Sequence, residues 1–344
     1  MSFVRNNWYV VAWSHEIDRA LLSRQILDES IVMYRTQAGD VVAFLDVCPH
    51  KKLPLSHGRL KGDSIECGYH GIRFDCTGVC ERVPGQGTVP AASVVKKYPI
   101  AERMGCVWAW MGDPELADES QIFDLPEFHD KQWSAVHGDA LEIDANYMLL
   151  ADNLCDPAHV SFVHQTTLGN EDGEDVPVNT EKQGNSVITH RWVLDSTPIP
   201  LFQKFGNFKG KVDRWHYYYF HAPNIAIIDF GSADVGTGAP QGARDNCIQL
   251  FACHFLTPVS EGKTIDFWMH VKNFQPKDAE TNEQLSDAFR EAFQEDKTIL
   301  EACQKEEDKD HQWRPLRLAI DRGPKRMQKI VQKMLDDEKA SSIK

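Results

Sequence analysis

Residues 48–70, "CPHKKLPLSHGRLKGDSIECGYH", contain two short cysteine–histidine pairs that decide how the N-terminal part of the chain folds. One residue separates Cys48 from His50, and after sixteen more residues Cys67 and His70 follow with two residues between them. Each pair offers one thiolate and one imidazole from a loop between expected strands. A structural zinc site more often takes its cysteines from one local pair and its histidines from another. The interleaved order favours a centre of two irons, one held by two cysteines and the other by two histidines.

That ligand pattern is typical of a Rieske [2Fe–2S] cluster, whose neutral imidazoles raise the reduction potential above that of an all-thiolate cluster. The alternative is a structural zinc loop. Cys76 and Cys80 lie close by, but no local histidine matches their spacing, and we interpret them as residues that do not bind the metal. The segment therefore predicts a small domain built around a redox cofactor.

Short β-strands are predicted on both sides of this segment. The runs "SIVMYRT" (30–36), "VVAFLDV" (41–47) and "CVWAWMG" (106–112) are rich in β-branched or aromatic residues and are bounded by Gly, Asp or Pro. An acidic, turn-rich stretch, "GDPELADES", then spans residues 112–120. We place a domain boundary in it and expect domains over residues 1–115 and 116–344.

The second domain is expected to mix helices with long strands. A helix over residues 141–164 is predicted to be interrupted near Asp156 and Pro157, because Asp is a good N-cap and Pro fits the first helical turn. Long strands are expected over residues 186–195, 212–230, 247–257 and 264–274. A helical pattern covers 278–308, and a charged helix closes the chain. The predicted fold class is α+β, a small all-β domain followed by a domain of helices and an antiparallel sheet.

Composition limits the partners and the compartment. The 344 residues carry a formal net charge of −14, which disfavours nucleic acid and anionic membranes as partners. No apolar run approaches the roughly 18 residues that a membrane helix needs, and the N-terminus lacks the pattern of a signal peptide. Nine cysteines in such a chain indicate a reducing compartment, so we expect a cytoplasmic protein.

A second group of ionisable residues lies in "DNLCDPAHVSFVH", residues 152–164. His159 and His164 are five residues apart, so on a regular helix they would not share a face. They can meet at one metal ion only if the helix deforms or ends between them. Asp156, three residues before His159, is placed to accept its second ring N–H. The alternatives are a pair of core histidines with satisfied hydrogen bonds and a general acid/base pair.

A mononuclear iron that activates O₂ typically binds two histidines and one carboxylate. In the helix over 278–308, Asp296 falls on the apolar face that Phe293 and Leu300 define, whereas Glu291 and Glu295 are expected to point elsewhere. A carboxylate on a buried face must be paired or coordinated to offset its desolvation. Asp296 is therefore the predicted third ligand, with a buried salt bridge as the alternative.

With these motifs in place, the chain resembles the α subunits of Rieske non-haem iron oxygenases over nearly its whole length. The resemblance includes the short monooxygenases of that family, the vanillate and dicamba O-demethylases and toluenesulfonate methyl-monooxygenase. It rests on four motifs in the family's order, "FVRNNWYVVAW", "CPH…CGYHGIRFD", "NYMLLADNLCDPAHVSFVH" and "FQEDKTILEA". One departure is Lys51-Lys52, where the family often has Arg-Gly or a similar pair after the first histidine.

The resemblance implies a fold and a set of roles. The second domain would be a helix-grip sheet that encloses the iron, and Asp156 would connect His159 to His70 of a neighbouring subunit in a homo-oligomeric ring, usually a trimer. Asn153 and Asp156 are the residues expected to act in catalysis beside the metals. The metal ligands implied are Cys48, His50, Cys67 and His70 for the [2Fe–2S] cluster, and His159, His164 and Asp296 for a mononuclear Fe(II).

The expected activity is that of a terminal oxygenase that uses O₂ and electrons from NADH to hydroxylate a methyl or methoxy group of a small aromatic acid, with O-demethylation as the favoured outcome. The run from Gly236 to Gly242 contains Pro240 and precedes no helical pattern, so it does not predict a dinucleotide site. A separate NADH-linked reductase of the flavin or ferredoxin type is therefore expected. Two alternatives remain open here, cis-dihydroxylation of an aromatic ring and a non-catalytic electron carrier. His254 and Asp229 are the candidate substrate contacts.

Overall fold

The computed structural model describes residues 3–90, 93–244, 247–309 and 314–341, and these form two compact units. The first unit comprises Phe3–Asp124 with Thr257–Ser260, and the second comprises Leu125–Leu256 with the chain from Glu261 onward. The division agrees with the predicted order of a small β domain followed by a mixed domain. Among the described residues, no helix has the length and apolar character needed to span a membrane.

The first unit continues to Asp124, nine residues beyond the boundary expected from composition. Trp8 Nε1 donates to the Asp118 carbonyl at 3.0 Å, and Arg103 Nη1 donates to the Ile122 carbonyl at 2.9 Å. These bonds join the acidic stretch to the first unit, although its exposed side chains gave it the composition of a linker.

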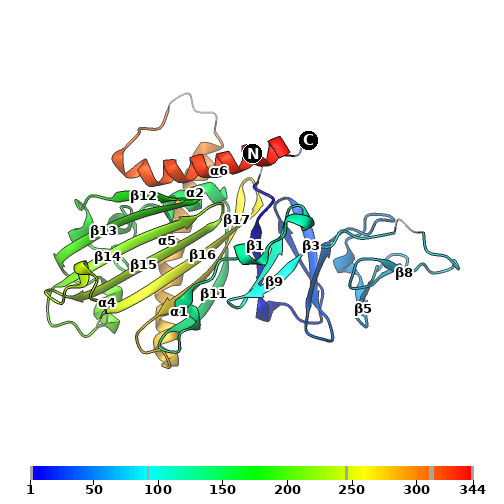
Figure 1. Ribbon diagram of the computed structural model, residues 1–344, viewed down its shortest axis with the longest axis horizontal. Coiled ribbons are helices and arrows are strands. Elements are labelled where there is room, and N and C mark those ends of the chain that lie inside the picture. The colour runs from blue at the N-terminus through cyan, green and yellow to red at the C-terminus, as the bar shows by residue number, and fades with distance from the viewer. Residues whose placement is uncertain (1–2, 91–92, 245–246, 310–313, 342–344) are drawn as a thin grey trace. The chain divides into compact units, whose positions relative to one another are not determined.

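Three small sheets make up the first unit (Figure 1). The sheet orders are β1-β10-β9, β2-β3-β4 and β5-β6-β7-β8. The strands are β1 (Trp8–Trp13), β2 (Leu22–Ile26), β3 (Glu29–Arg35), β4 (Val41–Leu45), β5 (Arg59–Lys61), β6 (Ser64–Glu66), β7 (Arg73–Phe74), β8 (Cys80–Arg82), β9 (Ile100–Arg103) and β10 (Cys106–Trp110). The three runs quoted above form β3, β4 and β10, as predicted. Their alternating or continuous apolar residues supply the buried side chains of these sheets.

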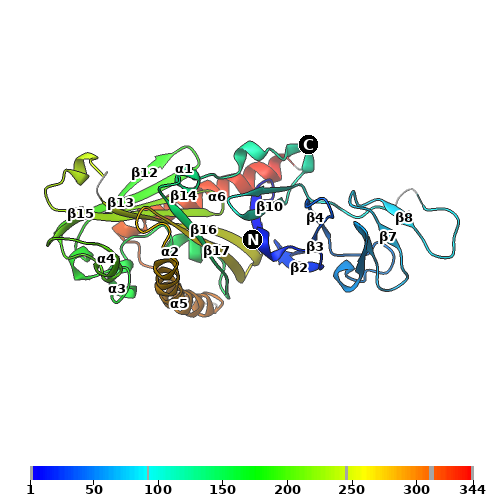
Figure 2. The same cartoon turned by 90° about the horizontal axis from the view of Figure 1, so that it is seen from below.

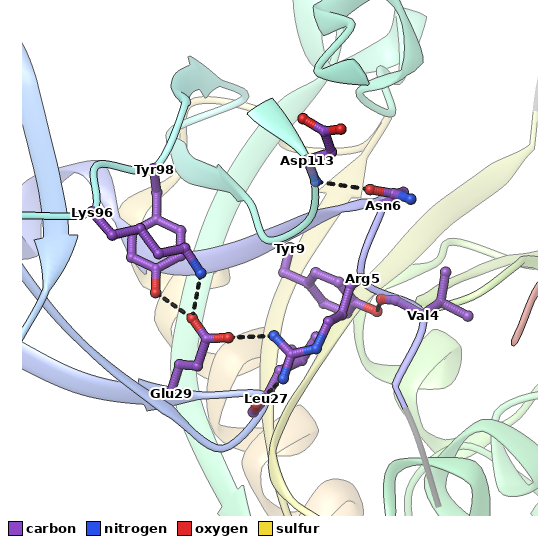
Figure 3. A network of polar contacts seen from close by, with 9 residues as sticks. All are labelled: Val4, Arg5, Asn6, Tyr9, Leu27, Glu29, Lys96, Tyr98 and Asp113. Carbon is purple, nitrogen blue, oxygen red and sulfur yellow. Dashed lines mark hydrogen bonds and ion pairs between the residues drawn. The ribbon is translucent and has the colours of Figure 1, made fainter. Parts of the chain in front are cut away.

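A carboxylate at the start of β3 joins three segments of the first unit (Figure 3). Glu29 accepts hydrogen bonds from Tyr98 and from Lys96 Nζ at 2.7 Å, and it pairs with Arg5 Nη1 at 2.5 Å. Arg5 Nη2 also donates to the Leu27 carbonyl at 3.1 Å. Burial alone would raise the pKa of Glu29, but the bonds from Lys96 and Tyr98 and the charges of Lys96 and Arg5 bring that pKa below its usual value. The ionised carboxylate thus holds the N-terminal arm against β3.

The second unit is built on a seven-stranded sheet of order β11-β17-β16-β15-β14-β13-β12. Its strands are β11 (Ser134–Ile143), β12 (Asn179–Gln183), β13 (Ser186–Ser196), β14 (Val212–His221), β15 (Ile225–Asp234), β16 (Ile248–Ser260) and β17 (Lys263–Lys272). Its α-helices are α1 (Pro126–His129), α2 (Tyr147–Asn153), α3 (Val160–Val163), α4 (Pro200–Phe205), α5 (Ala279–Glu307) and α6 (Arg322–Ser341). The long α5 lies with α2 and α3 on one face of the sheet, and α6 runs along the β12–β13 edge (Figures 1 and 2).

The α5 helix positions the second group of ionisable residues. Asp278 caps its N-terminus by accepting from Glu280 N at 3.0 Å and Thr281 N at 3.3 Å. Its buried side chains recur every three or four residues, and Phe289 and Phe293 pack against Trp268 of the sheet with ring centroids 6.1 and 5.1 Å away. The helical pattern predicted over 278–308 is confirmed.

Two elements differ from the expectation. The start of the helix expected over 141–164 is wrong, because residues 141–143 end β11. The interruption expected near Asp156 and Pro157 is confirmed, since it separates α2 from the one-turn α3. The single strand expected over 212–230 is also wrong, since a turn at 222–224 divides that run into β14 and β15. The second break lies inside a long run rich in β-branched and aromatic residues, so the hydrophobic pattern alone did not mark it.

Replacing Tyr98 with Phe tests the Glu29 network. The change removes one hydrogen bond to a partly buried carboxylate, so we expect the first unit to lose about 1–2 kcal/mol of stability near neutral pH. A carboxyl group with a lowered pKa contributes stability above its unfolded pKa and loses that contribution as the pH falls through the folded pKa. The difference between Tyr98→Phe and wild type should therefore shrink in acid. Urea unfolding at several pH values measures it.

The matched control is Tyr69→Phe, which removes the hydroxyl of a tyrosine that is 63% exposed. It should leave the stability of the same unit nearly unchanged. Equal effects of the two variants at all pH values would contradict a structural role for the Glu29 network.

Candidate metal centres

Two loops with the same hydrogen-bond pattern carry the cysteine–histidine pairs of the first unit. In one loop Cys48 N donates to the Leu53 carbonyl at 2.9 Å, and Lys52 N donates to the Cys48 carbonyl at 2.9 Å. In the other, Cys67 N donates to Ile72 O at 2.8 Å and Gly71 N donates to Cys67 O at 3.0 Å. Lys52 and Gly71 occupy equivalent positions, and both have positive φ, 61° and 68°. The two loops are therefore local structural duplicates.

The four donor groups of these loops lie in two different environments. Cys48 and Cys67 are buried, at 1% and 2% exposure, in an apolar cluster that includes Phe44, whereas His50 and His70 are exposed. The two imidazole rings are 4.6 Å apart at an interplanar angle of 61°. Burial and the neighbouring Cys67 thiol raise the pKa of Cys48, so binding of a metal in place of that proton is coupled to proton release. Two buried thiols beside two exposed imidazoles fit a cluster with one iron inside and one at the surface.

The two other cysteines of this segment pack in or against the same apolar cluster. Cys80 is buried with its Sγ 3.5 Å from the Arg82 carbonyl, and Cys76 is only partly buried. All nine cysteines are free thiols in the described structure.

In the second unit, a one-turn helix brings two histidines to one carboxylate. His159 precedes α3 and His164 follows it, so the ligand pair spans a single helical turn with a break at each side. Their ring centroids are 5.3 Å apart. His159 Nε2 lies 3.7 Å from Asp296 Oδ1, and His164 Nε2 lies 3.2 Å from Asp296 Oδ2. One donor atom from each residue falls within 4.8 Å of the others.

Two further side chains orient these donors. His164 Nδ1 lies 2.7 Å from Glu295 Oε2, and donation from Nδ1 leaves the Nε2 lone pair facing Asp296. Asn153 Nδ2 donates to Asp296 Oδ1 at 2.9 Å. The sequence analysis placed Glu295 away from the site, and that expectation is wrong. Consecutive residues of an α-helix are about 100° apart around its axis. Glu295 and Asp296 can therefore both contact a residue that lies beside the helix.

The charges around this group favour a bound cation. Burial would raise the pKa of Asp296, yet hydrogen bonding by His164 and the charges of both histidines lower it. Burial would lower the pKa of His164, but Asp296 and Glu295 raise it. The carboxylates of Asp296 and Glu295 stabilise a proton on His164. A divalent metal ion that binds in place of that proton would be stabilised by the same charges. Two imidazoles and one carboxylate fit a mononuclear iron with open coordination positions.

Asp156 adopts a different contact from the one expected. Its Oδ1 accepts from Ala158 N at 2.8 Å, which stabilises the turn before α3. His159 Nδ1 is buried and has no hydrogen-bond partner among the described residues. Within this chain, therefore, the carboxylate of Asp156 and the second nitrogen of His159 are not hydrogen-bonded to each other. Burial raises the pKa of Asp156, although the charge of His159 opposes the rise.

A cavity adjoins the His159, His164 and Asp296 donors. Its remaining walls come from the helices and from the sheet face that α5 covers. Those residues are Leu154, Val160, Leu168, His216, Tyr218, Ile228, Phe230, Ala252, Phe289 and Phe293. All but two are apolar. The cavity lining therefore favours an aromatic or aliphatic group over a charged one next to the metal centre.

Neither residue expected to contact substrate lines this cavity. Asp229 lies on the opposite face of β15 from Ile228 and Phe230, where it accepts from Trp215 Nε1 at 2.8 Å and Gln249 Nε2 at 2.8 Å. His254 is on the helix-covered face, but its Nδ1 lies 2.8 Å from Asp266 Oδ2 and its ring packs on Phe293. The polar residues that do line the cavity beside the metal-binding group are His216 and Tyr218 of β14, which the sequence analysis did not identify. Their alternation in β14 with Trp215 and Tyr217 is the signal that could have separated the two faces.

Comparison with known proteins decides the family. The Rieske [2Fe–2S] domain model matches residues 7–99, and the vanillate O-demethylase oxygenase C-terminal domain matches residues 143–337. The chain belongs to the Rieske non-haem iron oxygenases. It is thus an oxidoreductase with a [2Fe–2S] domain and a mononuclear iron site, and the resemblance stated above is confirmed.

Individual relatives cover almost the whole chain. It is 38% identical to the toluene-4-sulfonate monooxygenase system iron-sulfur subunit of Comamonas testosteroni over 88% of each chain. It is 33% identical to a vanillate O-demethylase oxygenase subunit of Pseudomonas sp. over 99% of this chain and 97% of that one. A crystal structure of dicamba monooxygenase with non-heme iron and dicamba superposes with a TM-score of 0.84 at 29% identity, covering 99% and 100% of the two chains. The fold, including the α+β class predicted from sequence, is that of these enzymes.

Replacing Lys52 with Gly should stabilise the first unit. A residue with a side chain at φ 61° carries a conformational cost that glycine avoids, and glycine already occupies the equivalent position in the second loop. We expect a gain of roughly 0.5–1 kcal/mol in thermal or urea unfolding, with the visible spectrum of the cluster retained. Lys51→Gly, at the adjacent exposed residue without positive φ, should give no gain. A lower stability of Lys52→Gly than of wild type would contradict the proposed backbone strain at Lys52.

Glu295→Ala should weaken iron binding at the second centre. Removing the acceptor of His164 Nδ1 frees the ring to rotate or change tautomer, and loss of such partners typically costs 10- to 100-fold in metal affinity. Competition of the protein with a chromogenic Fe(II) chelator measures that affinity. The control is Glu291→Ala, an exposed position on the same helix, which should bind iron like wild type. Equal Fe(II) affinity in Glu295→Ala and Glu291→Ala would contradict a role of Glu295 in iron binding.

Proposed function

We propose that this chain is the terminal oxygenase component of a multicomponent monooxygenase that hydroxylates a methyl or methoxy carbon of a small aromatic acid. The observation that carries the proposal is the apolar cavity whose wall contains His159, His164 and Asp296. A cavity of that kind offers an aryl ring a dry site beside the metal. The names of the relatives, which act in toluene-4-sulfonate, vanillate and dicamba metabolism, support aromatic acids as the substrate class.

In this proposal Cys48, His50, Cys67 and His70 hold the [2Fe–2S] cluster, and His159, His164 and Asp296 hold Fe(II). The cluster would supply electrons one at a time, and the mononuclear iron would supply the activation of O₂. Asn153 and Glu295 have a positioning task, because they bind Asp296 and His164 and hold the donor atoms in place.

The protein part of the reaction is to bind the ring, orient it and exclude water. Phe230, Phe289 and Phe293 provide aromatic faces against which a planar ring can pack. Hydroxylation of a methoxy carbon gives a hemiacetal, which breaks down to a phenol and formaldehyde. Hydroxylation of an aryl methyl group gives a benzyl alcohol. Both outcomes need only a methyl group directed at the metal, so O-demethylation is proposed as the favoured but not the sole result.

Electrons for the reaction would come from NADH through a separate flavin- or ferredoxin-type reductase. In the assembled enzyme, a homo-oligomeric ring and in our proposal a trimer, Asp156 would connect His159 to His70 of a neighbouring subunit. The Nδ1 of His159 supports this, because it is buried without a hydrogen-bond partner among the described residues.

The test is turnover by the purified, iron-loaded protein with NADH and a surrogate reductase. We expect 4-methoxybenzoate to give 4-hydroxybenzoate and formaldehyde in equal amounts, or toluene-4-sulfonate to give its benzylic alcohol. Asp296→Ala should lose mononuclear iron and turnover but keep the visible spectrum of the cluster, and Cys67→Ser should lose that spectrum. Formation of a ring cis-diol in place of these products would overturn the proposed reaction.

A further inference from the structure

Two polar side chains, His216 and Tyr218, face the metal cavity from strand β14. They are two residues apart, so they lie on the same face of the sheet, and their rings are near-parallel with centroids 6.5 Å apart. Both are buried, at 3% and 4% exposure. Apart from the three metal-binding side chains, every other residue in the cavity wall is apolar.

Neither side chain is satisfied by the protein. His216 Nδ1 is buried without a hydrogen-bond partner. Among the described residues, no hydrogen bond is made by the Tyr218 hydroxyl. Buried polar groups in folded proteins nearly always have a partner, and a group without one commonly marks a ligand or water site. Burial raises the pKa of Tyr218, so its hydroxyl remains a neutral donor. The cavity thus presents two unfilled hydrogen-bonding groups side by side.

Two buried cations flank His216 on the same face of the sheet. Arg191 is its cross-strand neighbour on β13, and Arg214 precedes it by two residues on β14; both are 2% exposed. Arg191 Nη1 donates to the Gly173 carbonyl at 2.6 Å, and Arg214 Nε donates to Ser196 Oγ at 3.2 Å. Among the residues that the structure describes, no carboxylate lies within ion-pair distance of either guanidinium. Their positive potential is therefore only partly offset, by Asp156 and Asp172 at longer range.

The positive potential of Arg191 and Arg214 favours an anion over a cation in the cavity. Burial, Arg214 and Arg191 together hold the pKa of His216 well below its usual value, so the imidazole is neutral. The same field favours a negative charge placed beside His216 and opposes a positive one, and it is weakly screened at a buried site. The cavity wall itself contains no Lys or Arg. An anion here would meet neutral donors at contact distance and would be attracted by two cations that neighbour His216 on the same sheet face.

We propose that His216 and Tyr218 are the anchor for the anionic group of the aromatic substrate, a carboxylate or sulfonate, and that Arg191 and Arg214 supply the charge that makes an anion preferred over a neutral analogue. This inference rests on the proposed function and assigns its specificity to residues of β14. The imidazole N–H and the phenol O–H each donate one hydrogen bond to the anion. The anchor then decides which ring substituents the enzyme accepts.

Equilibrium binding separates this anchor from a general effect on the cavity. Each probe is titrated anaerobically into the iron-loaded holoenzyme without reductase, and its Kd is measured by calorimetry, so that no turnover occurs. The probes are toluene-4-sulfonate and 4-methoxybenzoate, with toluene-4-sulfonamide and 4-methoxybenzamide as neutral analogues of nearly equal shape. Wild type should bind each anion at least tenfold more tightly than its neutral analogue.

Tyr218→Phe removes only a hydroxyl, and His216→Phe replaces the imidazole with a ring of similar size. Each should weaken anion binding about tenfold, as expected for one hydrogen bond to a charged group, and weaken amide binding less than threefold. The controls are Tyr219→Phe and His190→Phe, on the opposite face of the sheet, where His190 stacks on Tyr217. Both controls should bind all four probes like wild type.

The outcomes distinguish the two levels of the proposal. Turnover of aromatic acids together with unchanged anion binding in Tyr218→Phe and His216→Phe would overturn the anchor and leave the proposed function standing. Equal losses for the anion and its neutral analogue would also overturn the anchor, because they would indicate a change of cavity shape. Binding and turnover of none of the aromatic acids by wild type would overturn the proposed function and the anchor with it.

Discussion

A carboxylate on the apolar face of a long helix is the constraint on which the second unit depends. Asp296 is 5% exposed among phenylalanines and leucines, and an isolated charge there would cost several kcal/mol. His159 and His164 offset that cost only because the chain breaks on both sides of α3 and presents the two rings to one point. Asn153 and Glu295 then restrict the donors to one arrangement. The interrupted helices and the cavity beside them follow from this one charge.

The first unit has to hold a two-iron cluster, and it does so with two loops of the same local structure. Two loops of the same hydrogen-bond pattern place one buried thiol and one exposed imidazole each, so both ends of a cluster are held by equivalent backbone. Lys52 adopts the conformation that glycine has in the other loop. The Glu29 network lies outside these loops and joins the N-terminal arm to β3 and to Lys96 and Tyr98. The strands supply rigidity, and the loops supply the chemistry.

Much of this could be predicted from sequence because the decisive patterns are local. The spacing of Cys48, His50, Cys67 and His70 and the period of α5 depend on residues close together in the chain. The contact between Glu295 and His164 could not be predicted, since it depends on how α3 lies beside α5 in space. Asp229 was assigned to the substrate because it is a charge in an apolar strand; the structure places it on the face away from the cavity, paired with Trp215 and Gln249.

The division of labour between helices and strands has a consequence for how such enzymes diversify. The iron-binding residues come from α5 and the segments that flank α3, whereas most of the remaining polar and several apolar cavity residues come from β14, β15 and β16. A strand exchanges one inward side chain without moving its neighbours, because the next residue points to the other face. Mutations on β14 can thus alter substrate range while the metal site stays intact. Selection can therefore change the shape and polarity of the cavity by single substitutions, each of which starts from an intact metal site.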